Sequence, residues 1–147
     1  MKASKTSKPH PKKPRLKVGL KIRKQWLDKI LSGKKTWELR SLPTHKIKEH
    51  VGLIEVGAPA RVGLVGQVEI VGCIKLGHRT PSGQWKSKPG CTIRKTFKKH
   101  GCKSSDITAL GYNVLYAWVL RGAKRFQRPK PIKAASQCVV WQNLKLK

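Results

Sequence analysis

Three charged residues, Lys35, Glu38 and Arg40, lie close together within the segment GKKTWELR. Trp37 and Leu39 alternate with polar residues here, which predicts a strand whose successive side chains point to opposite faces. Glu38 and Arg40 would then lie side by side, with Lys35 at the turn into the strand. Such a group can do chemistry, because a lysine can activate a water or hydroxyl while an arginine holds an anionic substrate. The same spacing also suits a plain ion pair, which on a surface stabilises a fold by about 0–1 kcal/mol.

A short helix is predicted to lead into this strand. Apolar side chains recur on one helical face between residues 24 and 32. Gly33 follows them, at a position where glycine commonly ends a helix because it accepts a left-handed backbone. The residues of the apolar face are Trp26, Leu27, Ile30 and Leu31. The helix and its glycine would therefore fix where Lys35 enters the strand.

The order of helix, Gly33 and strand resembles the signature of the ASCH domain family, whose charged positions here are Lys35, Glu38 and Arg40. A further matching pair, Gln25-Trp26, lies upstream. Near the other end of the chain the matching residues are Tyr116-Ala117-Trp118-Val119-Leu120, Phe126, Pro129 and Val139-Val140-Trp141-Gln142. Together the matching blocks frame residues 16–144, which is most of the chain.

The resemblance implies a β-barrel similar to the PUA fold of RNA-modification proteins, with a cleft between the barrel and the first helix. Lys35, Glu38 and Arg40 would line that cleft. Some ASCH proteins deacylate a modified cytidine nucleoside and others have been described as ribonucleases, so these three residues are the catalytic candidates if the chain is an enzyme. Glu38 stands where the small deacylases carry a threonine nucleophile, and Thr36 lies two residues away. This difference favours a protein that binds without catalysing.

The net charge is the strongest global feature of the sequence. The 147 residues include 34 Lys and Arg but only 6 Asp and Glu, which gives a formal net charge of +28. A polyanion is the simplest partner for so much positive charge, and nucleic acid is the commonest polyanion. We expect RNA, with ribosomal RNA foremost, while DNA stays open because phosphate contacts carry no sequence information.

Three basic segments contain no acidic residue: residues 1–15, 77–105 and 121–133. The first is rich in lysine and proline, which predicts an extended arm without a fold of its own and leaves residues 16–147 as one barrel domain. The arm would follow phosphates or act as a nuclear-import patch, unless it is a solvated tail. The predicted RNA-binding residues are Lys8, Lys12, Lys13, Arg15, Lys34, Trp85, Arg94, Lys95, Lys98, Lys99, Arg121, Lys124, Arg125 and Arg128.

The remaining elements follow from alternation and from β-branched runs. Gly63, Gly66 and Gly72 interrupt the longest such run and predict bulges or bends. The two internal basic segments are expected to be loops, the first with a short helix at residues 91–100. Within that loop, Trp85 either stacks on bases or folds back on the barrel. Strands are predicted at residues 16–22, 51–56, 61–76, 112–120 and 137–144, besides the one that carries Glu38.

Many strands with few, short helices predict an α+β fold dominated by a small PUA-like barrel. Its core is expected to include Trp37 and Leu39 from the charged strand. Trp118 and Trp141 would join the same core from the closing strands.

The cysteine and histidine residues match no common metal site. Cys91, His100 and Cys102 could approach an ion together with His78, but their spacing fits no usual zinc site, so we expect no metal and no other cofactor. All five histidines lie in polar or loop stretches, where a solvated imidazole is expected. The cysteines do not form the pattern of a secreted disulfide scaffold, which indicates an intracellular protein.

The sequence therefore predicts an RNA-binding protein that docks on structured RNA through the arm and the basic loops. It would be a stable component of a ribosome or another large ribonucleoprotein, beside neighbouring proteins and without a membrane partner. The expected location is the cytoplasm, on ribosomes, in preference to the nucleus, with an organelle left open. The alternative is a hydrolase, either an amidohydrolase or a ribonuclease, that acts on an acylated cytidine nucleoside or on RNA through the ASCH cleft.

Overall fold

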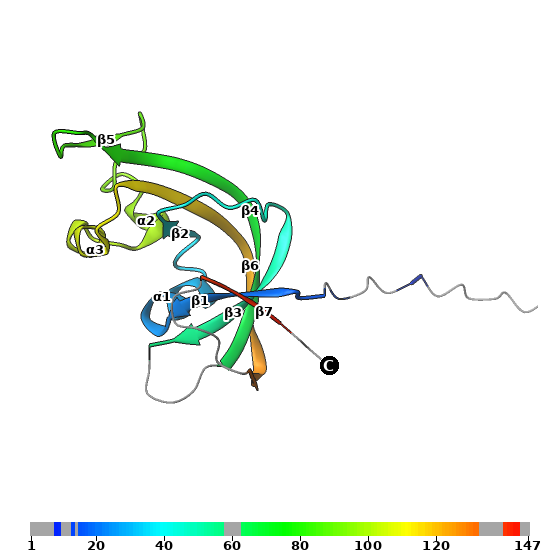
Figure 1. Ribbon diagram of the computed structural model, residues 1–147. Helices are drawn as coiled ribbons and strands as arrows, with labels where there is room; N and C mark the ends of the chain where they lie inside the picture. The colour runs from blue at the N-terminus through cyan, green and yellow to red at the C-terminus, as the bar shows by residue number, and fades with distance from the viewer. Residues whose placement is uncertain (1–7, 10–12, 14, 58–62, 133–139, 145–147) are drawn as a thin grey trace, which may run out of the picture.

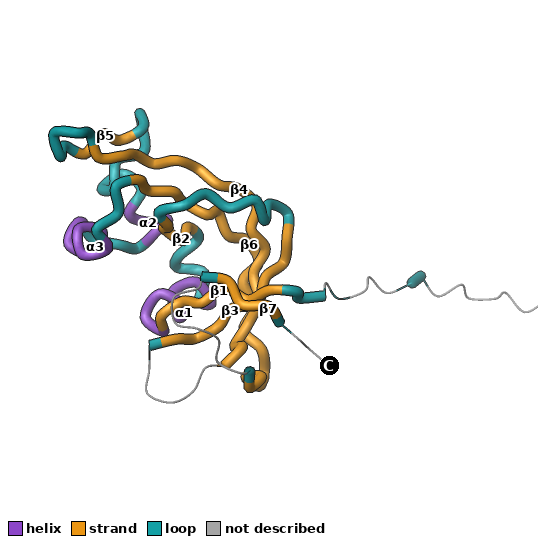
Figure 2. Tube along the Cα trace, in the orientation of Figure 1, coloured by secondary structure: helices purple, strands orange, loops and turns teal. Residues whose placement is uncertain are grey.

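The computed structural model describes residues 8–9, 13, 15–57, 63–132 and 140–144. These residues form a seven-stranded sheet in the order β2-β6-β4-β3-β1-β7, with the short β5 paired to β4 beside this path. The long β4 and β6 run side by side through the molecule (Figure 1), and strands dominate over helices (Figure 2). The elements are β1 (Val18–Arg23), α1 (Lys24–Leu31), β2 (Trp37–Arg40), β3 (Glu49–Val56), β4 (Gly63–Arg79), β5 (Trp85–Ser87), α2 (Phe97–His100), α3 (Ser104–Leu110), β6 (Val114–Pro131) and β7 (Trp141–Asn143).

The helix and glycine that precede the charged strand are confirmed. Helix α1 buries Leu27 and Ile30 against the sheet, and Ser32 closes its last turn by donating its backbone N–H to the Asp28 carbonyl at 3.0 Å. Gly33 then adopts a φ of +79°, a left-handed conformation in which a residue with a side chain is strained. The sharp exit turns the chain into β2 within a few residues and places Lys35 between α1 and β2.

Strand β6 corrects the prediction of a second basic loop. It continues through residues 121–131 and pairs with β4 as far as Pro131, so the hydrogen bonds of the sheet hold the segment that sequence composition assigned to a loop. Half-buried Ala123 and Phe126 interrupt the exposed basic residues, and each packs against a different core cluster. The predicted bulges are confirmed, because the pairing register shifts between Leu64 and Gly66 and again between Ile70 and Gly72.

The core consists of separate clusters, two of which lie on opposite faces of the β2–β6 pair. One contains Trp37, Leu39 and Ala117, and the other contains Trp118 and has Trp141 packed against its edge. Successive residues of a strand point to opposite faces, so Trp37 and Trp118 cannot share one core. The expectation that all four apolar residues belong to a single core is therefore wrong, although Trp37, Leu39 and Trp118 are buried as predicted.

The sheet is not a closed barrel, which corrects the predicted architecture. Among the described residues, β2 and β7 end the strand order and do not pair with each other through the backbone. They comprise only four and three residues, too few to complete the hydrogen-bonded ring that a barrel requires. Side chains bridge the opening instead. Arg40 donates from Nη2 to the Lys21 carbonyl at 2.9 Å, and the Trp118 and Trp141 rings stack with centroids 5.4 Å apart.

The N-terminal arm stays a prediction, because most of residues 1–15 lie outside the described part of the chain. Residues 137–139, the start of the predicted closing strand, also lie outside it. No helix in the described part has the length and apolar character that crossing a membrane demands.

Candidate functional site

Lys35 is a buried cation, with 2% of its surface exposed. Its ammonium donates to the Trp37 carbonyl and to the His100 carbonyl, each at 2.7 Å, and lies 5.5 Å from the centre of the Trp26 ring. The His100 carbonyl is at the last residue of α2, where a cation is favourable because the carbonyl ends of a helix carry partial negative charge. Lys35 therefore joins the start of β2 to the end of α2.

Glu38 and Arg40 lie on the face of β2 that Trp118 shares. The Glu38 carboxylate is buried, and its Oε1 is 3.9 Å from the Arg40 Nε. The Arg40 guanidinium also lies 5.7 Å from the Trp118 ring centre. Within the described part of the chain, Glu38 Oε2 and Arg40 Nε are buried without a hydrogen-bond partner. The structure thus brings together two of the three predicted catalytic residues and leaves one buried polar atom of each without a hydrogen-bond partner among the described residues.

The third residue, Lys35, is committed to other contacts. Its two short hydrogen bonds go to backbone carbonyls, and its ammonium also lies 4.0 Å from the Cys102 Sγ. An ammonium held in this way is positioned as a structural cation, because both carbonyls would lose their partner if it moved to a substrate. Thr36, the other hydroxyl of the signature, is exposed and offers its backbone N–H to the Lys99 carbonyl at 2.9 Å.

His100 is the residue that sequence reasoning placed wrongly. It was expected to be solvated, but none of its surface is exposed. Its Nδ1 accepts the Cys102 backbone N–H at 2.9 Å, so the proton is on Nε2, which donates to the Ile93 carbonyl at 3.0 Å. Burial lowers the pKa of His100, and nearby Lys35 lowers it further, against the opposing effect of the Ile93 hydrogen bond. The imidazole is a neutral bridge within the α2 segment.

The Cys102 thiol is a poor candidate for a catalytic nucleophile. Burial raises the pKa of its thiol, although the positive charge of Lys35 opposes that shift. A protonated, inaccessible thiol is a poor nucleophile. Across the described residues, no group of three His, Cys, Asp or Glu side chains is arranged to hold a metal ion, so Cys91, His100, Cys102 and His78 do not converge on one.

The stability of the fold is expected to decrease as the pH falls from about 7 to about 5, with His100 contributing. Because the folded state lowers the pKa of His100, the unfolded chain binds a proton at a higher pH than the folded chain does. The contribution of His100 is complete above the unfolded value of about 6.5 and is lost as the pH falls through the folded pKa. One proton gives a slope of at most about 1.4 kcal/mol per pH unit.

Urea unfolding of wild type, His100→Asn and His45→Gln across this pH range measures that slope. Asparagine can keep accepting the Cys102 N–H but does not titrate, so its slope should be shallower than that of wild type. The exposed His45 is the control, and its loss should leave the slope unchanged. An equal slope in wild type and His100→Asn would contradict the assignment.

The outer half of β6 presents a row of exposed cations. Arg121 and Arg125 are partly neutralised, because they pair with Glu69 and Asp28, each at 3.0 Å. Lys124 and Arg128 are exposed and have no acidic partner among the described residues. Of the four predicted RNA-binding residues on this strand, these two offer unopposed charge.

The segment around α2 is a second basic surface. Arg94, Lys95, Lys98 and Lys99 are all exposed, as predicted from the basic composition. Among them stands Phe97, 42% exposed, which sequence reasoning did not select. The sequence does contain a signal for Phe97, because it is the one aromatic residue within the basic run RKTFKK. An exposed aromatic ring among cations is the arrangement that stacks on unpaired bases.

Trp85 was the aromatic residue chosen for that role, and the structure supports its alternative placement. The indole is half-buried, packs against the Trp37 cluster and donates its N–H to the Ser87 hydroxyl at 3.1 Å. A Cβ at Gly77 would lie 2.9 Å from its ring, so the missing side chain there makes room for it. Trp85 is folded back on the sheet.

The remaining predicted RNA-binding residues are Lys8, Lys12, Lys13, Arg15 and Lys34. Lys34, Lys8, Lys13 and Arg15 are exposed, whereas Lys12 lies outside the described residues.

A mostly-sheet α+β fold with few short helices, entered by a helix and a Lys-x-x-Glu-x-Arg strand, defines a PUA-like domain. The chain belongs to the ASCH domain family, whose model matches residues 20–130. No curated protein matches the sequence significantly.

Solved structures of ASCH from Zymomonas mobilis share the fold. One has a TM-score of 0.64 at 14% identity and covers 87% of each chain. Two single-substitution variants of that protein match with TM-scores of 0.62 and 0.63, at 13% and 14% identity. The first variant covers 87% of each chain, and the second covers 89% of this chain and 91% of its own.

Proposed function

We propose that this protein binds structured RNA through its exposed basic surfaces, as a stable component of a ribosome or another large ribonucleoprotein. The observation that carries the proposal is the unopposed charge: a net +28, with exposed cations on β6 and around α2 that have no acidic partner in the described part of the chain. Positive charge displayed in this way releases counterions when phosphates bind, which is the main source of affinity for nucleic acid.

The two basic surfaces have complementary roles in this proposal. On β6, Lys124 and Arg128 are four residues apart along an extended strand, about 13 Å, so they neutralise separate phosphates. Around α2, Phe97 adds an exposed ring that stacks on a base. Bases are free to stack on protein where RNA is single-stranded, in loops, bulges and ends. Structured RNA with an accessible loop therefore suits both surfaces.

A permanent place in a particle follows from the same charge. Cations left without anions repel one another, and a large polyanion relieves that repulsion across the whole surface. We infer a cytoplasmic, ribosome-associated location beside neighbouring proteins in preference to the nucleus. The predicted arm at residues 1–15 would extend the contact with RNA.

A hydrolase acting on RNA or on an acylated cytidine nucleoside is the second candidate. It is favoured by the buried Glu38 Oε2 and Arg40 Nε, which have no hydrogen-bond partner among the described residues. Against it stand the commitment of Lys35 to two carbonyls and the exposure of Thr36, whereas Glu38 is buried. RNA binding accounts for the distribution of charge, whereas a nucleoside hydrolase requires only the cleft.

The double variant Lys124→Ala, Arg128→Ala tests the proposal on full-length protein. Binding to an RNA hairpin is measured by fluorescence anisotropy at several salt concentrations. Each lost phosphate contact should make the slope of log K against log salt shallower by about 0.7–0.9, so the double variant should differ from wild type by about 1.4–1.8. The charge-preserving variant Lys124→Arg, Arg128→Lys is the matched control and should keep the wild-type slope. Absence of RNA binding by wild type at low salt would overturn the proposal.

A further inference from the structure

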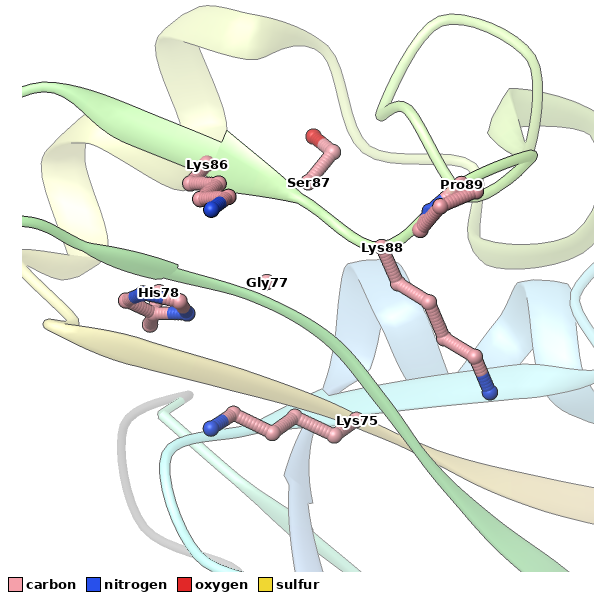
Figure 3. Close-up of a pocket in the computed structure, with 7 residues that line it drawn as sticks. All are labelled: Lys75, Gly77, His78, Lys86, Ser87, Lys88 and Pro89. Atoms are coloured by element: carbon pink, nitrogen blue, oxygen red, sulfur yellow. The ribbon is translucent and has the colours of Figure 1, made fainter.

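A pocket of about 400 Å³ lies where β5 pairs with the end of β4 (Figure 3). Its titratable groups are those of Lys75, His78, Lys86 and Lys88. Lysine stems and the Pro89 ring give it largely apolar walls beneath the charged ends. The residues that line it belong to β4, β5 and the two positions after β5, whereas Glu38 and Arg40 belong to β2, so the pocket is separate from the Glu38–Arg40 pair.

The pairing of β5 with β4 brings the residues that carry these cations to one pocket. His78 lies opposite Lys86 in the ladder, and Lys88 donates its backbone N–H to the Leu76 carbonyl at 2.7 Å. Trp85 packs against the Trp37 cluster, so the next residue of the strand, Lys86, points to the other side. Ser87 and Lys88 line the pocket as well. Figure 3 shows the Ser87 hydroxyl and the Lys88 ammonium on opposite sides of the chain.

Gly77 allows the two strands to approach this closely. A Cβ at that position would lie 2.6 Å from the Lys86 carbonyl oxygen, a distance that no real side chain tolerates. The glycine therefore allows Lys86 to lie opposite His78 of β4.

The positive charge of the pocket is unopposed. Lys75, Lys86 and Lys88 are exposed, and none forms an ion pair or hydrogen bond with another described side chain. The whole segment of residues 77–105 lacks Asp and Glu. Three like charges around one hollow repel one another, and a bound anion would convert that repulsion into attraction. Lysine ammonium groups are common ligands of phosphate.

We propose that this pocket binds a phosphate group together with the sugar attached to it, as part of the RNA that the protein binds. The inference rests on the proposed function and adds a specific site to it. The volume falls within the range of small-ligand sites, roughly 300–1,000 Å³, and accommodates a nucleotide. In this proposal the exposed lysine side chains of the pocket turn their ammonium groups to the phosphate, the sugar rests on the lysine stems, and His78 contacts its edge. The phosphate comes either from within the RNA chain or from a 5′ end.

The test compares two charge-matched variants of the full-length protein. Lys86→Ala, Lys88→Ala removes two cations from the pocket, and Lys17→Ala, Arg23→Ala removes two exposed cations elsewhere. Each is titrated with an RNA hairpin across a range of salt concentrations. The pocket variant should have a salt slope shallower by about 1.4–1.8, and the control variant by less than half of that. Equal slopes for the two variants would overturn the proposal.

Two further arms identify the source of the phosphate and separate this inference from the proposed function. Binding of a hairpin with a 5′-phosphate is compared with binding of a hairpin with a 5′-hydroxyl. If wild type prefers the 5′-phosphate and the pocket variant loses that preference, the pocket binds a terminal phosphate. If wild type shows no preference, the pocket binds an internal phosphate.

Independently, adenosine 5′-monophosphate is titrated into the protein while the His78 ring resonances are followed by NMR. A shift in wild type that is lost in Lys86→Ala, Lys88→Ala supports the site even if RNA binding fails. No shift in wild type, together with equal salt slopes, rejects the site while leaving RNA binding intact.

Discussion

The affinity of this protein for RNA is expected to fall by about 10³–10⁵-fold between roughly 50 and 200 mM salt, as it does for proteins that make 6–10 phosphate contacts. The exposed cations of β6, of the α2 segment and of the β5 pocket supply that number of contacts: Lys124 and Arg128, then Arg94, Lys95, Lys98 and Lys99, then Lys75, Lys86 and Lys88. Salt competes with each of them, because the counterions released on binding must be returned to a more concentrated solution.

The measurement is a set of anisotropy titrations of one RNA hairpin at four or more salt concentrations. Replacing chloride by another monovalent anion at constant concentration is the control for anion binding to the protein itself. Repeating the titrations with the variant Phe97→Leu separates stacking from charge, since this variant should bind more weakly at every salt concentration while keeping the slope. An affinity that is insensitive to salt would contradict RNA binding through the described cations.

Lys35→Met is expected to lower the free energy of unfolding by about 3 kcal/mol. The substitution keeps most of the stem but removes the ammonium that donates to the Trp37 and His100 carbonyls. Hydrogen bonds to charged groups contribute about 1.5–3 kcal/mol each, and both buried carbonyls would lose their partner. For a domain of this size the midpoint of thermal unfolding should fall by about 6–12 °C.

Lys34→Met is the matched control, because Lys34 is the neighbouring residue, carries the same side chain and is exposed. Its thermal midpoint should stay within about 1–2 °C of wild type, as is usual for surface substitutions. Well below its midpoint, Lys35→Met should bind RNA as wild type does, because the buried ammonium contacts no phosphate. Unchanged stability in Lys35→Met would show that the ammonium is free for another role, which is the requirement of the hydrolase alternative.

Local signals in the sequence predicted the part of the fold around the charged strand. The apolar face of α1, the glycine at its end and the alternation of Trp37 and Leu39 each depend on neighbours within a few residues, so they can be recognised in the chain alone. The bulges at Gly66 and Gly72 were predictable for the same reason. The exposed cations followed from composition, because lysine and arginine stay at the surface unless they are paired.

The features that were missed depend on residues far apart in the chain. Lys35 receives its role from a carbonyl 65 residues away, at His100, and no spacing pattern shows such a partner. His100 is buried because α2 packs against β2, although its neighbours in the sequence are polar. The basic end of β6 is a strand because β4 pairs with it, and whether the sheet closes depends on how two short edge strands meet.

The opening between β2 and β7 has a consequence for how the molecule moves. Backbone pairs hold β4 to β6 along most of their length. Across the opening, the Arg40 guanidinium of β2 bonds to the Lys21 carbonyl of β1, and the Trp118 indole of β6 stacks on the Trp141 indole of β7. Those two contacts can separate without breaking a backbone hydrogen bond of the sheet. The edge strands β2 and β7 can therefore move apart while β4 and β6 stay paired. The β7 amide hydrogens that pair with β1 stay hydrogen-bonded in such an opening. The amide hydrogens of β2 and β7 that face the gap would exchange with solvent through it, long before those of β4 and β6.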